Sequence, residues 1–334
     1  MDNIKNFPDH SEKAWRGIVN FSPPQLLLDQ SYMDVGHLGR TVGWDWDFRQ
    51  LDTGKLDARA TAIGGHNVQV IKFQLSRGFH QLGCAPDGML TFGVVGPGVP
   101  DFKWCSRNLS GGALLNFNMQ SGFDGVSLAG FSGYTVIFRP HYLQFLAEQM
   151  DISTPVEYLS ADRIGWFSQR TVMLGKKLDT IYRKISRLGT RVLNEYSEII
   201  NEEIGFTILG ELTGKTERSQ PYATVNKTII LRNALKILND PDRLPITVAK
   251  FRELVGVSSS SLNRIFLSEF GVPPKSYIRS RCLSAARDAL ACVSPEAKVS
   301  DIANRWGFWH MGQFARDYRR MFGELPSDTF KRNH

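Results

Sequence analysis

The chain has 334 residues, of which 42% are hydrophobic and 22% are charged. This balance excludes a disordered or fibrous chain, and the length suits two or three domains. No apolar run approaches the roughly 18 residues that would span a bilayer. The first ten residues lack the basic-then-apolar order of a secretory signal, and the four cysteines form no C-x-x-C pair. We therefore expect a cytoplasmic protein with reduced thiols and no membrane partner.

The positive charge is concentrated in the C-terminal third. Residues 221–334 contain 18 Lys and Arg against 10 Asp and Glu, which leaves 22 basic and 23 acidic residues for the first 220. Such asymmetry favours a module that binds a polyanion, attached to a neutral module. A solvated basic face is the alternative.

Residues 1–140 form the first predicted domain, which is rich in short strands from residue 21 onward. Turn-forming Gly, Pro, Asp and Asn clusters separate the predicted strands Val68–Leu75, Met89–Val95, Ala113–Met119 and Tyr134–Phe138. Many short strands with such turns indicate a β-barrel or a jelly-roll-like double sheet.

Residues 141–215 form a helical extension of this domain. The pattern predicts one helix over His141–Met150 and then a longer one. The apolar residues of the longer one recur near helical spacing and are Trp166, Met173, Leu174, Leu178, Ile181, Tyr182, Ile185 and Leu188. A further helix is predicted to carry an apolar stripe, made of Leu193, Tyr196, Ile200, Ile204, Ile208 and Leu212. This stripe either packs on the chain's own strands or forms the contact with a second copy in a homodimer.

Residues 216–221 are polar and form the predicted linker to a third, all-helical domain at 222–334. The expected fold class is therefore α+β and multidomain. The helical domain contains two copies of one small motif, at about 246–270 and 299–322. Each copy has two short amphipathic helices around a glycine, which is the layout of a helix-turn-helix.

In the first copy, a helix with Val248, Phe251 and Leu254 inward ends at Gly256, and Ser258 caps the second helix. The second copy turns at Gly307, with Phe308 as a buried plug after the turn. The inward face of its first helix is Val299, Ile302, Ala303 and Trp306, and its second helix packs through Phe314, Tyr318 and Phe322. A helix over Pro273–Ala291 joins the copies.

Specific positions in and around both copies form a pattern. In the second copy they are Ile302, Ala303, Gly307, Phe308, Phe314, Arg316, Tyr318, Arg320, Phe322, Gly323, Pro326 and Ser327. In the first copy and the joining helix they are Gly256, Val257, Ser258, Leu262, Arg264, Phe266, Gly271, Tyr277, Leu283, Ala286, Arg287 and Leu290. This pattern resembles the DNA-binding domain of the AraC/XylS family of bacterial transcription regulators over about 100 residues.

The resemblance implies that Ser259–Glu269 and His310–Met321 are recognition helices that enter successive segments of the major groove. It places base contacts at Ser260, Asn263, Arg264, Met311, Gly312 and Arg316. Because Gly312 has no side chain, Gln313 is expected to read a base in its place. Arginine suits guanine, asparagine suits adenine, and Met311 offers only apolar contact to a thymine methyl. Lys275, Arg279, Arg319 and Arg320 are better placed as phosphate contacts.

The N-terminal part is also similar to known regulators. Trp46–Leu51 with Gly54, followed by Val68–Gln81 and Met89–Gly93, looks like the cupin-like sensor region of ethanolamine-operon-type regulators. That resemblance implies a sensor or dimerisation role and a possible small-molecule effector. The sequence does not name the effector, and it does not reveal the operator, the target genes or the sign of regulation.

Metal chemistry is not expected in the barrel. The seven histidines form no H-x-H pair, and His66 and His80 stand alone. We therefore expect no cofactor, no metal and no catalytic residues.

The prediction is a regulator that binds double-stranded promoter DNA, as a homodimer, with RNA polymerase as a further implied partner and activation of transcription as the implied role. Two alternatives stay open. One is an architectural or partner-recruiting DNA-binding protein without an effector, and the other is a metal-dependent barrel enzyme fused to a DNA-binding domain.

Overall fold

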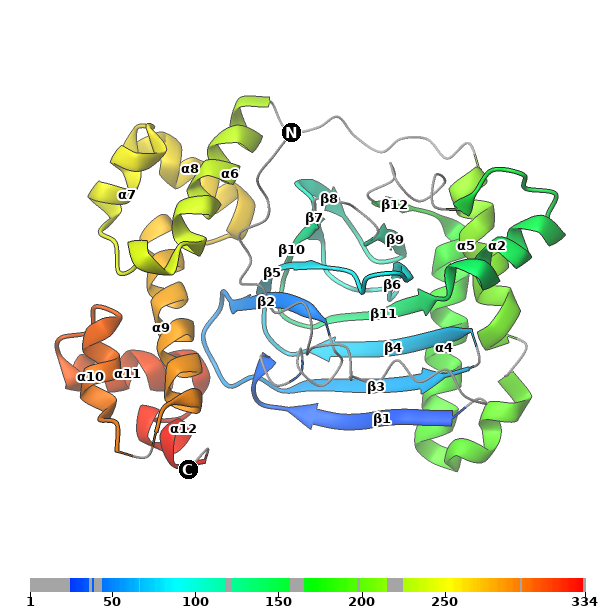
Figure 1. Cartoon of the computed structure of the whole chain (residues 1–334), viewed down its shortest axis with the longest axis horizontal. Coiled ribbons are helices and arrows are strands. Elements are labelled where there is room, and N and C mark those ends of the chain that lie inside the picture. The colour runs from blue at the N-terminus through cyan, green and yellow to red at the C-terminus, as the bar shows by residue number, and fades with distance from the viewer. Residues whose placement is uncertain are drawn as a thin grey trace. The chain divides into compact units, whose positions relative to one another are not determined.

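The computed structural model describes residues 25–35, 38, 44–65, 67–117, 122–156, 165–196, 199–214, 225–294 and 296–332. The chain separates into two compact units (Figure 1). The first comprises Met1–Asp47, Asp57–Ser76 and Gln81–Gln220, and the second comprises Phe48–Leu56, Arg77–His80 and Pro221–His334. The predicted linker, 216–221, lies outside the described residues.

Two antiparallel sheets are built by the N-terminal part. The seven-stranded sheet has the order β1-β3-β4-β11-β6-β9-β12, and the five-stranded sheet has the order β2-β5-β10-β7-β8 (Figure 1). The strands are β1 Gln25–Tyr32, β2 Asp45–Gln50, β3 Ala58–Gly64, β4 Val68–Leu75, β5 Phe79–Cys84, β6 Leu90–Val95, β7 Phe102–Trp104, β8 Arg107–Leu109, β9 Ala113–Asn116, β10 Phe123–Ser127, β11 Phe131–Phe138 and β12 Gly165–Phe167. The double-sheet prediction is confirmed. The closed barrel is wrong, because each sheet ends in edge strands.

The predicted strands correspond to observed ones. β4 has the predicted bounds, β6 begins one residue later than predicted, and β11 begins three residues earlier. For the predicted strand Ala113–Met119, β9 ends at Asn116, and residues 118 and 119 lie outside the described residues. The apolar runs are buried because the sheet is covered: all six residues of β6 are buried. Phe92 and Val94 share one hydrophobic cluster with Leu174 and Leu178 of α4 (Gln169–Leu188).

The first predicted helix of the first unit, His141–Met150, is observed one residue earlier, whereas the later ones are more broken than predicted. The helices of this unit are α2 Pro140–Gln149, α4 Gln169–Leu188, a 3-10 helix Thr190–Tyr196, a π-helix Ile199–Glu203 and α5 Ile204–Thr213. Trp166 belongs to strand β12 and not to a helix. Of the other residues in that pattern, Leu174, Leu178, Ile181, Tyr182 and Ile185 are buried on one face of α4. Met173 and Leu188 are exposed, at 56% and 64%.

The apolar stripe lies inside the first unit. It is divided among the 3-10 helix, the π-helix and α5, so it is not the single helix that was predicted. Leu193, Ile200, Ile204, Ile208 and Leu212 are at most 1% exposed, and Tyr196 packs against the same core from the edge. Of the two interpretations of the stripe, the structure favours packing on the chain's own strands, and it leaves these side chains inaccessible to a second copy.

The second unit contains the helical part of the chain. Its helices are α6 Val225–Asn239, a 3-10 helix Pro241–Arg243, α7 Val248–Val255, α8 Ser259–Phe270, α9 Pro274–Cys292, α10 Val299–Arg305, α11 Met311–Phe322 and α12 Pro326–Arg332. Within this unit, α9 lies between the α7–α8 pair and the α10–α11 pair (Figure 1). This is the predicted all-α arrangement of two motifs joined by one helix.

Two short segments, Phe48–Leu56 and Arg77–His80, also belong to the second unit. The buried Arg49 guanidinium donates hydrogen bonds to Tyr277 Oη at 3.0 Å and to Asn239 Oδ1 at 2.6 Å. His80 Nδ1 lies 2.6 Å from the same Tyr277 hydroxyl. These polar groups complete the core of the helical unit, so its boundary in sequence is not the single position that was predicted.

Two features are absent from the part of the chain that the structure describes. No helix there is long and apolar enough to cross a membrane. No group of three or more His, Cys, Asp or Glu side chains there could hold a metal ion. His66 lies outside the described residues, and His80 belongs to the cluster with Tyr277.

Candidate nucleic-acid interface

The first helix-turn-helix is formed by α7 and α8. Gly256 follows α7 with a φ of +74°, a left-handed conformation that favours glycine, and the chain turns there. Ser258 caps α8, because its hydroxyl accepts a hydrogen bond from Ser261 N at 3.1 Å. Both predictions are confirmed.

The core of this motif is aromatic. Phe251 of α7 and Phe266 of α8 meet edge to face, with ring centroids 5.8 Å apart, and both are fully buried. Val255 completes the inner face of α7 one turn after Phe251. Val248 and Leu254 are 36% and 42% exposed, so the prediction that they point inward was wrong.

The second helix-turn-helix is formed by α10 and α11. The turn is at Gly307, whose φ is +84°. Ile302, Ala303, Phe314, Tyr318 and Phe322 form its core together with residues of α9. Phe308 packs against this core with its ring 5.0 Å from that of Phe314, but it is half-buried and not a buried plug. The recognition helix begins at Met311, one residue later than predicted, and His310 gives it no side-chain cap.

α9 holds the two motifs at a fixed separation. It has 19 residues and therefore extends about 28 Å at 1.5 Å per residue. One part of α9 is buried against the second motif through Leu283, Ala286 and Leu290. Near the start of α9, Tyr277 packs on Phe266 and Phe270 of the first motif. A rigid spacer of this length is comparable with one turn of B-form DNA, about 34 Å.

The predicted base-reading residues of α8 lie together on its outer surface. Ser260, Asn263 and Arg264 are all exposed and recur at the helical spacing of three and four residues. The Ser260 hydroxyl lies 3.1 Å from that of Ser258 at the cap. Asn263 and Arg264 therefore present the amide and guanidinium groups that suit base edges in a major groove.

The predicted base-reading residues of α11 are linked to one another. Arg316 Nη2 donates a hydrogen bond to Gln313 Oε1 at 2.7 Å, and Gln313 Nε2 donates one to Asp317 Oδ2 at 2.8 Å. Gln313 and Arg316 are exposed, whereas Met311 is half-buried. Asp317 was missed in the sequence, where nothing marks an acidic residue as part of a DNA-reading surface.

The predicted phosphate contacts differ in their surroundings. Lys275, Arg319 and Arg320 are exposed and form no ion pair with a described residue. Arg279, in contrast, pairs with Asp317, and its guanidinium lies 5.8 Å from the centre of the Phe308 ring. The structure therefore leaves three of the four cations free to meet phosphates and holds the fourth against α11.

Trp309 is a further residue that the sequence analysis did not select. It lies two residues before the start of α11, and 71% of its surface is exposed. The N-terminal residues of a recognition helix contact base edges in helix-turn-helix proteins. A large aromatic side chain at this end of α11 is therefore part of the candidate interface.

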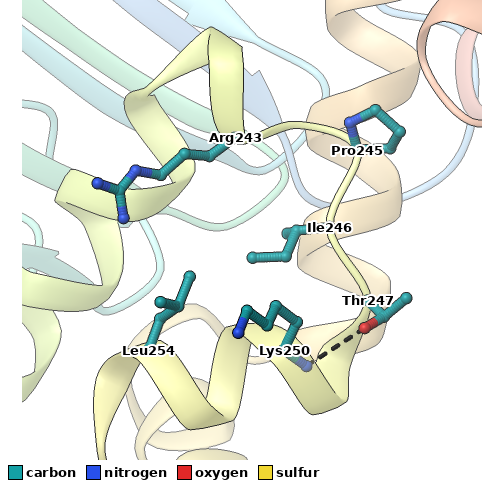
Figure 2. Close-up of a pocket in the computed structure, with 6 residues that line it drawn as sticks. All are labelled: Arg243, Pro245, Ile246, Thr247, Lys250 and Leu254. Carbon is teal, nitrogen blue, oxygen red and sulfur yellow. Dashed lines mark hydrogen bonds between the residues drawn. The ribbon is translucent and has the colours of Figure 1, made fainter.

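A pocket lies at the start of α7. It has a volume of about 370 Å³ and is lined by Arg243, Pro245, Ile246, Thr247, Lys250 and Leu254 (Figure 2). Thr247 caps α7 by accepting a hydrogen bond from Lys250 N at 3.2 Å. Arg243 and Lys250 pair with Asp240 at 2.8 Å and Glu253 at 3.2 Å. No sequence motif marks this pocket, whose basic side chains surround an apolar lining.

The helical unit matches known proteins. A family model described as a helix-turn-helix domain matches residues 253–332. The XylDLEGF operon transcriptional activator of Pseudomonas putida is 32% identical over 142 residues, which are 42% of this chain and 42% of that protein. The probable thc operon regulatory protein of Rhodococcus erythropolis is 36% identical over 103 residues, 30% of this chain and 31% of that protein. The chain thus matches less than half the length of these curated relatives.

The chain also shares sequence with a protein of solved structure. A probable AraC family transcriptional regulator from Rhodopseudomonas palustris is 33% identical, with coverage of 32% of this chain and 97% of that chain and a TM-score of 0.29. The residues matched by the family model, 253–332, run from the last turn of α7 to the end of α12. Through this DNA-binding domain, the chain belongs to the AraC/XylS family of transcription regulators.

Proposed function

We propose that this chain is a sequence-specific transcription regulator, most simply an activator, that places α8 and α11 in successive segments of the major groove of promoter DNA. The observation that carries the proposal is the presence of an exposed arginine on each recognition helix, Arg264 and Arg316, on two motifs that α9 holds apart. Arginine bidentate to guanine O6 and N7 is the commonest specific contact. The matched relatives are named as activators and regulators of operons, which supports the same role here.

The proposal assigns a role to each exposed polar group. On α8, Arg264 reads guanine, Asn263 reads adenine, and Ser260 contacts a neighbouring base. On α11, Arg316 reads guanine beside Gln313, while Met311 offers apolar contact to a thymine methyl. Lys275, Arg319 and Arg320 bind phosphates, and Arg279 joins them only if its pair with Asp317 opens. These contacts fix the protein on the duplex and add affinity that depends on salt.

The first unit takes the sensor role in this proposal. Its double sheet supports the cupin-like interpretation, with an unidentified small molecule as effector and RNA polymerase as a further partner in the cytoplasm. A homodimer is also part of the proposal, but through a surface other than the buried stripe. The exposed Phe167 and Met173, at 49% and 56%, offer apolar area near the start of α4. Sedimentation of wild type and Met173→Asp tests that surface, and equal masses for both would count against it.

Selection of DNA sites in vitro with the full chain tests the proposal directly. We expect an enriched site with two elements about 10 base pairs apart. Titration of that site and of random DNA across a salt series then separates specific from electrostatic binding. Binding that is equally tight on every sequence would favour the architectural alternative.

Single substitutions test the two arginines. Arg264→Ala and Arg316→Ala should each weaken binding to the selected site by about 1–3 kcal/mol and relax the base preference at one position. Arg232→Ala is the matched control, because Arg232 is exposed on α6 outside both motifs. Losses of equal size on every DNA sequence would make Arg264 and Arg316 phosphate contacts.

A further inference from the structure

A carboxylate lies at the centre of the polar surface of α11. Asp317 Oδ2 accepts a hydrogen bond from Gln313 Nε2 at 2.8 Å, and the same oxygen pairs with the Arg279 guanidinium of α9. The side chain of Asp317 is 18% exposed and that of Arg279 is 42% exposed. Asp317 therefore joins a residue of the helix between the motifs to a residue of the second recognition helix.

The carboxylate also fixes the orientation of the Gln313 amide. A carboxylate only accepts hydrogen bonds, so the amide must turn its NH₂ group toward Asp317 and its oxygen away. That oxygen, Oε1, accepts the hydrogen bond from Arg316 Nη2 at 2.7 Å. The direction of the two hydrogen bonds is therefore set by the charged groups that flank Gln313: the Asp317 carboxylate takes the NH₂ group, and the Arg316 guanidinium takes the oxygen. Both ends of the Gln313 amide already have protein partners, so its capacity to read a base by itself is reduced.

We propose that Asp317 is a positioning residue that acts through Gln313 to aim Arg316 at a guanine. By pairing with Arg279, Asp317 also keeps Arg279 from contacting a phosphate. This inference rests on the proposed function, in which Arg316 reads a base. Asp317 has two effects in it. It raises discrimination between base pairs at the Arg316 position, and it lowers affinity for DNA of any sequence.

Fold stabilisation alone does not explain the arrangement. The pair between Asp317 and Arg279 lies at a partly exposed surface, where ion pairs contribute little to stability. The core of the motif is formed by other residues of α11, namely Phe314, Tyr318, Met321 and Phe322. Asp317 can therefore be changed without removing a core side chain.

The variant Asp317→Asn tests the proposal, because it keeps the size of the side chain and removes its charge. Binding is measured for the selected site and for the same site with the guanine opposite Arg316 replaced by adenine, across a salt series. Asp317→Asn should reduce the ratio of the two affinities about fivefold or more, since the amide of Gln313 is then free to turn. The slope of log affinity against log salt should steepen by about 0.9, because Arg279 gains one phosphate.

Two further variants keep the result interpretable. Asp301→Asn removes the same charge from α10, where Asp301 is exposed and accepts a hydrogen bond from Ser300 Oγ at 3.4 Å, and it should leave the ratio unchanged. Gln313→Leu breaks the link from the other side, so it should lower the ratio without steepening the salt slope. It also tests the proposal if Asp317→Asn does not fold.

The outcomes separate this inference from the proposed function. If Arg316→Ala abolishes the preference for guanine while Asp317→Asn and Gln313→Leu retain it, the role of Asp317 is wrong and the proposed function stands. If Arg316→Ala leaves the preference unchanged, Arg316 is not a base reader and the proposed function is wrong at that residue.

Discussion

Gly307 lies so close to Pro245 that a Cβ atom on Gly307 would come within 2.8 Å of the Cβ of Pro245. Gly307 is the turn of the second motif, and Pro245 precedes α7 of the first, so the two motifs meet directly at this point. Both the positive φ of Gly307 and this contact exclude a larger residue.

Gly307→Ala should therefore lower the free energy of unfolding by about 1–2 kcal/mol or more, measured by urea denaturation. Gly312→Ala is the matched control. Gly312 lies inside α11 with open space around its Cα, so alanine there should be neutral or stabilising by about 0.5–1 kcal/mol. Equal effects of the two changes would show that the Gly307–Pro245 contact does not constrain the turn.

The stability of the second motif should fall in acid through Glu324. Burial of the Glu324 carboxyl raises its pKa. Hydrogen bonds from Arg332 and Thr329 and the charges of Arg287 and Arg332 lower the pKa by a larger amount, so the pKa lies below its usual value. A carboxyl whose pKa is lower in the folded state stabilises the fold above its unfolded pKa of about 4.3, and this contribution is lost as the pH falls through the folded pKa.

Glu324→Gln should remove this pH dependence and cost about 2 kcal/mol at pH 7, because four hydrogen bonds from charged or hydroxyl groups are weakened. Denaturation of wild type and variant at pH 7 and pH 4 measures both effects. The difference between the two proteins should be smaller at pH 4. A constant difference would assign the dependence to other carboxylates.

Trp309 should report the docking of α11 on DNA. An indole that is 71% exposed changes its emission when a nucleic acid covers it, and burial of its surface contributes to affinity. Trp309→Phe should remove most of the change in tryptophan fluorescence on addition of the selected site, while Trp309→Ala should also weaken binding. If Trp309→Phe retains the full fluorescence change, another tryptophan is its source.

The stripe residues should behave as core residues. Ile208 is fully buried in α5, so Ile208→Ala should lower the free energy of unfolding by about 2–5 kcal/mol. Leu188→Ala is the control, because Leu188 is exposed on α4 and is not part of the surface proposed for the homodimer; the expected change is within about 0.5 kcal/mol. If Ile208→Ala instead changes the sedimenting mass and leaves stability unaltered, the stripe is an interface between copies.

The features that were predicted correctly are those that residues close in sequence determine. Gly256 and Ser258 mark the turn and the cap of the first motif through their own backbone and side-chain chemistry, and both were placed correctly. The β4 strand was also correct, since alternation and flanking turns define it locally. The family resemblance predicted the bounds of both recognition helices, and each bound agrees with α8 or α11 to within one residue.

The features that were missed depend on what lies next to each element. The Leu193–Leu212 stripe has helical spacing, but packing in the core divides it into 3-10, π and α segments. Val248 and Leu254 fit an inward face by spacing, yet α7 presents Phe251 and Val255 instead. Arg279 and Asp317 are 38 positions apart in sequence, and the packing of α9 on α11 brings them together. The sequence therefore could not show that Arg279, a predicted phosphate contact, is paired with a carboxylate.

The first helix of the DNA-binding unit is tied to a recognition helix. Lys227, in the first turn of α6, pairs at 2.9 Å with Glu269 at the end of α8, and the Glu269 side chain is 4% exposed. A buried carboxylate resists separation from its cation, because the loss of an ion-pair partner is costly away from water. The pair therefore couples the start of α6 to the end of α8, so a displacement of α6 relative to α8 would have to open it.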